Sequence, residues 1–184
     1  VIITVFDETN PIANAGPDQN LCTPNTTTTM AGSALIFPAT GEWVRVSGSG
    51  NIADPTSPTT SVSGLAVGEN VFQWTVHNGP CGPSTSDQMS IFVYDDENPD
   101  ANAGPDQQVC TPLTGTVLAG SPVTFPATGE WTLVSGQGTI VDPNDPATEV
   151  TDLGVGENIF EWTVDNGPCG AGRTSDQVSI FLFD

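Results

Sequence analysis

The sequence lacks positive charge. It contains no lysine, two arginines and one histidine against 22 aspartates and glutamates, so its formal net charge is −20. Because so few cations cannot neutralise a phosphate backbone, nucleic acid is excluded as a partner. The absence of lysine also excludes the lysine–asparagine isopeptide crosslinks that stiffen some bacterial surface domains. The acidic residues have two interpretations: a solvated surface that keeps the protein dispersed outside the cell, or ligands for a divalent cation.

Long apolar runs are absent as well. No stretch approaches the 18 apolar residues of a membrane-spanning helix, so we expect no direct membrane insertion. No signal peptide is present, as expected of an internal piece of a longer chain. Helical periodicity is also missing, and short runs of Val, Ile, Thr, Phe and Trp alternate with turns among 20 glycines and 16 prolines. This composition predicts an all-β protein.

What the chain does have is an internal repeat with an offset of 88 residues. The phrase FPATGEWVRVSGSG at 37–50 returns as FPATGEWTLVSGQG at 125–138. Residues 13–81 align with 101–169 without a gap and are identical at 45 of 69 positions. About 90 residues are enough for one small core, so the duplication predicts two domains.

The predicted boundaries follow from this offset. Residues 8–95 form the first repeat and residues 96–184 the second. The opening VIITVFD at 1–7 matches the start of neither repeat, but resembles the endings MSIFVYD and VSIFLFD. We expect it to be the last strand of a preceding copy, in a longer tandem array.

Strand periodicity is clearest in NVFQWTVHNG, where Phe72, Trp74 and Val76 alternate with polar residues. That is the period of a strand with one buried face. Similar runs lie at 27–36, 42–47, 59–66 and 89–94. Short strands with a turn every eight to twelve residues predict two tandem immunoglobulin-like β-sandwiches of about seven strands each, with cores of two tryptophans and two or three phenylalanines.

A catalytic centre is not expected. His77 is the only histidine and Asp165 takes its place in the second repeat, so no serine or cysteine triad can form in both copies. The recurrent carboxylates Glu42 and Glu69 lie beside turns rather than in a predicted cleft. We therefore predict no catalytic residue and no enzymatic activity.

Each repeat contains two cysteines, Cys22 and Cys81 in the first and Cys110 and Cys169 in the second. No CxxC spacing accompanies them, so a metal site is not expected. They are either buried free thiols or intradomain disulfides. We expect the disulfides Cys22–Cys81 and Cys110–Cys169, each closing a loop of about 60 residues and stabilising its repeat by roughly 4 kcal/mol. Such bonds favour an oxidising, extracellular setting.

The densest acidic stretch, YDDENPDANAGPDQ at 94–107, lies at the junction of the two repeats. It offers hard oxygen ligands within a short segment, and Ca²⁺ takes six to eight such oxygens. We expect no cofactor to be required. A calcium ion at the interdomain junction is a candidate, with ligands Asp95, Asp96, Glu97, Asn98 and Asp106, and the alternative is a solvated acidic linker.

A wider pattern resembles a known kind of repeat. ANAGPDQ followed by a cysteine, then GEW with VSGxG, DP, LxVGEN, FxWTVxNGPC and TSDQ, is similar to the PKD-like repeats of giant Bacteroidota cell-surface adhesins, including the SprB-like gliding-motility adhesins. The resemblance covers nearly the whole chain in both copies. It departs from the PKD signature WxFGDG, in whose place stands FxWTVxNG.

The resemblance implies an immunoglobulin-like sandwich, export by the type IX secretion system and anchorage at the outer membrane. It also implies a function: these repeats would be rigid spacers in a long surface filament for adhesion and gliding, with neighbouring repeats as partners. The alternative is that each repeat itself binds a polysaccharide or an abiotic surface. The candidate binding residues are Phe92, Tyr94, Phe181 and Phe183, which lie out of phase with the apolar positions of the last strands.

Overall fold

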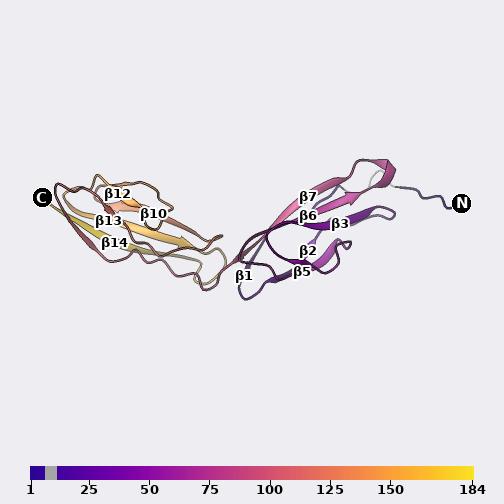
Figure 1. Cartoon of the computed structure of the whole chain (residues 1–184), viewed down its shortest axis with the longest axis horizontal. Helices are drawn as coiled ribbons and strands as arrows, with labels where there is room; N and C mark the ends of the chain where they lie inside the picture. The colour runs from indigo at the N-terminus through magenta and orange to yellow at the C-terminus, as the bar shows by residue number, and fades with distance from the viewer. Residues whose placement is uncertain (7–11) are drawn as a thin grey trace. The chain divides into compact units, whose positions relative to one another are not determined.

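The computed structural model describes residues 1–6 and 12–184. The chain forms two compact units, Val1–Tyr94 and Asp95–Asp184 (Figure 1). Throughout the described residues, every regular element is a strand except one 3₁₀ turn, Gly79–Cys81. Each unit pairs a four-stranded sheet with a three-stranded one. The predicted all-β class and immunoglobulin-like sandwich are confirmed.

The first unit contains, in its described part, β1 (Gln19–Cys22), β2 (Thr27–Ala31), β3 (Thr40–Ser47), β4 (Asn51–Ile52), β5 (Thr59–Ser63), β6 (Gly68–His77) and β7 (Thr85–Tyr94). One sheet has the order β1-β7-β6-β3 and the other the order β2-β5-β4. All these pairs are antiparallel except β1 with β7, which is parallel.

The second unit repeats this topology with β8 (Gln107–Cys110), β9 (Thr116–Val117), β10 (Thr128–Ser135), β11 (Thr139–Ile140), β12 (Glu149–Thr151), β13 (Gly156–Asp165) and β14 (Arg173–Phe183). Its sheets have the orders β10-β13-β14-β8 and β11-β12-β9. Here β8 and β14 are the parallel pair. Both units therefore place their first strand beside their last.

The N-terminal segment differs from the repeats. Residues 1–6 form neither helix nor strand. Residue 7, the last of the segment expected to continue a preceding copy, lies outside the described residues. Strand pairing by this segment stays a prediction.

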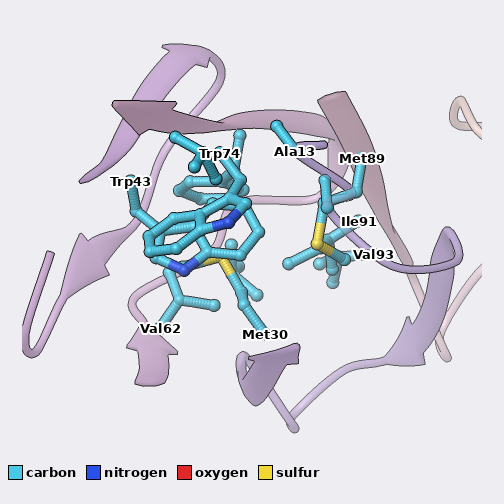
Figure 2. Packing of buried hydrophobic residues seen from close by; sticks show 12 residues of the cluster. Ala13, Met30, Trp43, Val62, Trp74, Met89, Ile91 and Val93 are labelled. Atoms are coloured by element: carbon cyan, nitrogen blue, oxygen red, sulfur yellow. The ribbon is translucent and has the colours of Figure 1, made fainter. Parts of the chain in front are cut away.

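Two tryptophans face each other in the core of each unit. Trp43 on β3 and Trp74 on β6 lie directly opposite in the register, with ring centroids 5.2 Å apart and planes tilted by 39°. Figure 2 shows Met30 and Val62 beside the two indoles. Since an offset, tilted arrangement suits the quadrupoles of two aromatic rings, the pair adds to the stability from burial alone.

Both buried indole N–H groups have acceptors. Trp43 Nε1 donates to the carbonyl of Pro58 at 3.2 Å, and Trp74 Nε1 donates to the hydroxyl of Ser33 at 3.3 Å. The second unit repeats the pair and its acceptors as Trp131 with Pro146 and Trp162 with Ser121. The rings therefore fill the core without leaving an unsatisfied donor.

The buried face of β6 is as predicted, but the aromatic content of the core is not. Phe72, Trp74 and Val76 are all buried. The expectation of two or three core phenylalanines per repeat is wrong, because only Phe72 and its counterpart Phe160 are fully buried. The other phenylalanines of the repeats lie outside the core: Phe37 and Phe125 are exposed, and those of the last strands alternate with the buried positions.

The glycine in the repeated phrase FPATGEW is explained by this packing. A Cβ atom on Gly41 would overlap the six-membered ring of Trp74, and one on Gly129 would overlap Trp162 in the same way. Gly41 lies on β3, two residues before Trp43, which pairs with Trp74. Gly129 has the same place on β10. The phrase returns in both copies because the indole leaves no room for a side chain at this position of the neighbouring strand.

We predict that Gly41→Ala combined with Gly129→Ala destabilises each unit by about 1–3 kcal/mol, because the added methyl groups overpack the indoles. Urea unfolding followed by tryptophan fluorescence measures this change. Gly82→Ala is the control, since that glycine has φ 169° and its Cβ would meet nothing within 4 Å. Equal midpoints for the two variants would contradict the packing account.

Candidate mechanical site at the terminal strands

The chain enters and leaves each unit along one pair of strands. In the first unit β1 pairs in parallel with the end of β7, and the register runs from Gln19 opposite Ile91 to Cys22 opposite Tyr94. In the second unit β8 pairs with the end of β14 in the same way, from Gln107 opposite Ile180 to Cys110 opposite Phe183. The residues just before β1 also run alongside β7. We therefore call 13–22 and its counterpart 101–110 the entry segments.

Side chains of the last strand hold the start of the entry segment. The hydroxyl of Thr85 accepts from Ala13 N at 2.9 Å, and Asp87 Oδ2 accepts from Ala15 N at 2.8 Å. In the second unit Thr174 and Asp176 accept from Ala101 and Ala103 at 2.8 and 2.9 Å. Ala13 and Ala15 are themselves buried. The motif TSDQ therefore anchors ANAGPDQ, a role that its sequence alone does not reveal.

A second carboxylate in each unit closes the turn that leads into its first strand. Asp18 Oδ1 accepts from Ser90 N at 2.8 Å, and Asp106 accepts from Ser179 N at 2.9 Å. The turn needs Gly16, whose φ is +85° and whose Cβ would meet the carbonyl oxygen of Ala31 at 3.0 Å. The entry segment is thus bonded along its length, first by side chains and then by strand pairing.

A buried asparagine on β6 connects the last strand of the first unit to two neighbouring loops. Asn70 is 1% exposed, and its Nδ2 donates to Ala66 O at 2.9 Å and to Ile91 O at 3.2 Å. Its Oδ1 accepts from Ser49 N at 2.8 Å. Asn158 makes the equivalent bonds in the second unit. The repeated VGEN motif therefore has a structural role.

The DP motif forms a tight turn under the first tryptophan. Asp54 Oδ1 accepts from both the hydroxyl and the backbone N–H of Thr56, at 2.8 and 2.9 Å, and these bonds lower the pKa of that carboxyl. The carbonyl of Pro55 accepts from Trp43 N at 2.8 Å. The turn thus fixes β3 next to the core.

The predicted intradomain disulfide of the second repeat is wrong. Cys110 is a free, exposed thiol, whereas Cys169 is buried and disulfide-bonded. Cys110 lies opposite Phe183 at the end of β14, while Cys169 precedes Arg173 at its start. The ten residue steps between these ends span about 33 Å. A disulfide needs Cα atoms within about 7 Å of each other.

The first repeat has the same geometry, so the pair Cys22–Cys81 is wrong as well. Cys22 lies opposite Tyr94 at the end of β7, and the backbone of Cys81 ends the 3₁₀ turn that precedes Thr85. The strand between them spans about 30 Å. Cys22 is nevertheless disulfide-bonded. The coarser prediction, that the chain carries a disulfide, is confirmed.

Four of the five predicted calcium ligands, all except Glu97, use a side-chain oxygen in a hydrogen bond within the second unit. Side-chain oxygens accept from backbone N–H groups at 2.9–3.0 Å in the pairs Asp95–Glu97, Asp96–Gly170, Asn98–Thr124 and Asp106–Ser179. In the part of the chain that the structure describes, no three His, Cys, Asp or Glu side chains gather to hold a metal ion. Calcium binding by these residues stays a prediction from the sequence.

The aromatic residues of the last strands alternate with the core as predicted. Ile91 and Val93 are buried, and Phe92 and Tyr94 between them are half-buried. On β14, Phe181 and Phe183 are 40% and 43% exposed with ring centroids 4.6 Å apart. The structure places these rings on the outer face and leaves a binding role untested.

The residues considered for catalysis lie apart at the surface. His77 is exposed, with Nδ1 2.7 Å from Ser84 Oγ. Glu42 is exposed on β3, and Glu69 accepts from the hydroxyl of Ser90 at 2.6 Å. In the residues described, no helix has the length and apolar character that a membrane-spanning segment needs.

No family model matches the chain. The dyslexia-associated protein KIAA0319-like protein of Mus musculus is 28% identical to it over 168 residues, which are 84% of this chain and 16% of that protein. The chain therefore spans about a sixth of the length of this curated relative.

Among solved structures, one of Dscam that addresses isoform specificity aligns with a TM-score of 0.56 and 14% identity, over 95% of this chain and 47% of that one. This likeness concerns the fold alone. The PKD domain from the KIAA 1837 protein is 26% identical, with a TM-score of 0.41, over 49% of this chain and 92% of that domain. The chain shares its fold with known β-sandwich domains.

We predict that Asp87→Ala combined with Asp176→Ala destabilises each unit by about 1–3 kcal/mol, because the N–H groups of Ala15 and Ala103 lose charged acceptors next to the core. Thermal unfolding measures the loss. Glu42→Ala combined with Glu130→Ala removes the same charge from exposed strand positions and is expected to leave the midpoint nearly unchanged. A similar loss of stability in both variants would mean that the removed negative charge, and not the lost hydrogen bonds to the entry segment, causes the destabilisation.

Proposed function

We propose that the chain is a structural repeat pair of a long extracellular adhesin or filament, in which each repeat is a rigid spacer that resists tension. Tandem domains of this fold are typical of extracellular adhesion and structural proteins. The observation that carries the proposal is the parallel pairing of the first and last strands in both units. A disulfide and the strongly acidic surface are consistent with an oxidising environment outside the cell.

The parallel pair determines how a pulled repeat must fail. Tension pulls the start of the entry segment one way and the end of the last strand the opposite way, along the length of both. The hydrogen bonds between them are then loaded in shear and must break together, whereas antiparallel terminal strands would separate one bond at a time. The side-chain bonds of Thr85, Asp87 and Asp18 add to the number that share the load.

The finer identity rests on the sequence resemblance. We propose that the spacer belongs to a surface adhesin of the gliding-motility kind, exported by type IX secretion and anchored at the outer membrane, with neighbouring repeats as its immediate partners. The eleven residues of β14 make each repeat about 35 Å long in the strand direction. A tandem array of such repeats would hold a terminal adhesive domain well away from the cell.

Single-molecule force spectroscopy tests the spacer role, with a reductant present so that only the fold resists the load. We predict that Asp87→Ala/Asp176→Ala lowers the unfolding force, because it removes bonds that are loaded in shear. The matched control is Gly41→Ala/Gly129→Ala, which destabilises the core outside the terminal strands. If the core variant lowers the force as much as the anchor variant, the terminal strands are not the resisting element and the proposal fails.

The exposed pair Phe181–Phe183 favours a second candidate, a binding module for a polysaccharide or an abiotic surface. Carbohydrate sites commonly combine exposed aromatic rings with polar groups, and Gln108 and Glu157 lie opposite Phe181 on the neighbouring strands. On a glycan array, this role requires binding that Phe181→Ala/Phe183→Ala abolishes. Phe125→Ala, which removes another exposed ring, is the control; no binding by the unmodified chain would exclude the glycan form of this role.

A further inference from the structure

Two rows of polar side chains lie next to each other on the four-stranded sheet of the second unit. In one row, Thr128 on β10 lies opposite Asp165 on β13, which lies opposite Arg173 on β14. In the next row, Glu130 lies opposite Thr163. Side chains directly opposite each other have Cβ atoms about 5 Å apart, and two residue steps of about 7 Å separate the rows. The sheet therefore gathers five polar side chains within a small area.

These side chains face away from the core. Along β13, Thr163 and Asp165 alternate with the buried Trp162 and Val164, and successive side chains of a strand point to opposite faces. The five polar side chains and Gly129 line a hollow of about 70 Å³. This volume holds more than one water-sized group but is far below the roughly 300–1,000 Å³ of a pocket that encloses a drug-sized ligand. The hollow can therefore receive one edge of a small molecule.

An unpaired hydroxyl lies in the hollow. Thr163 is only 9% exposed, and no residue that the structure describes bonds to its hydroxyl, although buried polar groups are normally hydrogen-bonded. The first repeat is different: Gln73 Nε2 donates to the hydroxyl of the equivalent Thr75 at 3.4 Å. Glu161 replaces Gln73 in the second repeat and accepts from Gln177 at 3.0 Å. The Thr163 hydroxyl is therefore left for a ligand.

The guanidinium of Arg173 is also unpaired. It is the only cationic side chain of the second unit. Within that unit, whose residues are all described, no ion pair or side-chain hydrogen bond engages it, and Asp165 opposite it accepts from Gly167 N at 2.9 Å. In the first repeat the equivalent residues are Ser84 and His77, whose side chains bond to each other, Oγ to Nδ1, at 2.7 Å. In place of that internal bond, the second repeat has two charged groups that face a hollow.

The charges around the hollow select the ligand. Glu130 and Asp165 are negative and Arg173 is positive, so an anion meets two like charges and a cation meets one. A hydroxyl group suits both kinds of partner, because it donates to a carboxylate and accepts from a guanidinium. Two adjacent hydroxyls can therefore pair with Asp165 and Arg173 at the same time. We propose that the hollow binds a neutral sugar unit through two adjacent hydroxyl groups, as a site of the second repeat alone.

This site goes beyond the spacer function, which needs no ligand. It also differs from the exposed ring pair Phe181–Phe183, which lies farther along the same strand. Arg173 and Phe181 are eight residue steps apart, or about 26 Å. A sugar unit in the hollow therefore does not touch those rings, and variants can separate the two places.

Nuclear magnetic resonance of the ¹⁵N-labelled two-repeat chain tests the site. The probes are the methyl glycosides of glucose, galactose and mannose, three neutral sugars that differ in the arrangement of their hydroxyls. With at least one of them we predict saturable shifts of the Thr163, Asp165 and Arg173 amide signals, with a Kd on the order of 1 mM, and no shifts at the equivalent positions of the first repeat. No saturable shift with any of the three, or equal shifts in both repeats, would overturn the proposal.

A double variant supplies the matched control. Asp165→His/Arg173→Ser gives the second repeat the side chains that the first repeat carries at these positions. The first repeat folds with them, and the net charge stays the same because one negative and one positive group are removed. We predict unchanged thermal unfolding and a Kd raised about tenfold or more, since hydrogen bonds to two charged groups are lost. A smaller rise would contradict the assignment of the site.

Thr163→Val tests the buried hydroxyl separately. The substitution keeps the shape of the side chain and removes a polar group that has no partner without ligand. We predict weaker sugar binding together with equal or higher thermal stability. Unchanged binding would show that the hydroxyl does not contact the sugar and would count against the site.

Two further comparisons identify the ligand class and the place of binding. Methyl glucuronide and glucosamine carry a negative and a positive charge, and we predict that both bind more weakly than the best neutral sugar; tighter binding of either would overturn the neutral class. Sugar binding that survives Asp165→His/Arg173→Ser but is lost in Phe181→Ala/Phe183→Ala would place the sugar on the exposed rings instead. The unfolding force that tests the spacer function is a separate measurement, so either idea can fail alone.

Discussion

The parallel pairing of the first strand with the last determines how each repeat can work. The other strand pairs of the described chain are antiparallel. Because the two terminal strands run in the same direction, the chain enters at one end of the last strand and leaves at the other. An antiparallel arrangement would bring both ends of the repeat together, and the repeat would add little length to a filament.

A four-residue edge strand is a weak element, so the rest of the unit must support it. The buried alanines of the entry segment allow the backbone to approach the core closely, and Thr85 and Asp87 replace the strand bonds that β1 does not make. The central strands β6 and β7 are held in place by the facing indoles and by the asparagine that bonds across to Ile91. The entry segment therefore packs on a last strand that is itself fixed on its other side by β6.

The sequence predicts the fold well where one face of a strand is buried. Phe72, Trp74 and Val76 alternate strictly, and the structure buries all three. The sequence pattern does not reveal β1 or β4. Both strands are short and lie at the edge of a sheet, without a continuous apolar face. Thr85 and Asp87 resemble loop residues in the sequence because they are polar and follow a run of turn residues. In the structure they lie on β7, and their side chains accept hydrogen bonds from the entry segment. Their recurrence as Thr174 and Asp176 was the available signal.

The cysteine prediction failed for a different reason. A spacing of about 60 residues suits a bond across an immunoglobulin-like sandwich, but spacing contains no information on which end of a strand a residue occupies. Only the parallel register of β1 with β7 places Cys22 at the exit, a full strand away from the turn that contains Cys81. The direction of one edge strand, which no local pattern encodes, therefore places the two cysteines of a repeat at opposite ends of its last strand.

Several acidic residues have a structural role, besides the solvation and cation binding that the sequence suggests. Four aspartates accept backbone N–H groups of irregular segments: Asp54 and Asp87, with Asp142 and Asp176 in the second unit. Asp18 and Asp106 accept from Ser90 and Ser179 on the last strands. Such groups need an acceptor that strand pairing does not supply, and a carboxylate forms a stronger bond than a neutral oxygen. Part of the negative charge is therefore structural. The same charge recurs in each copy. Since screening limits its reach to about 8 Å at physiological salt, it opposes only close contact between neighbouring molecules.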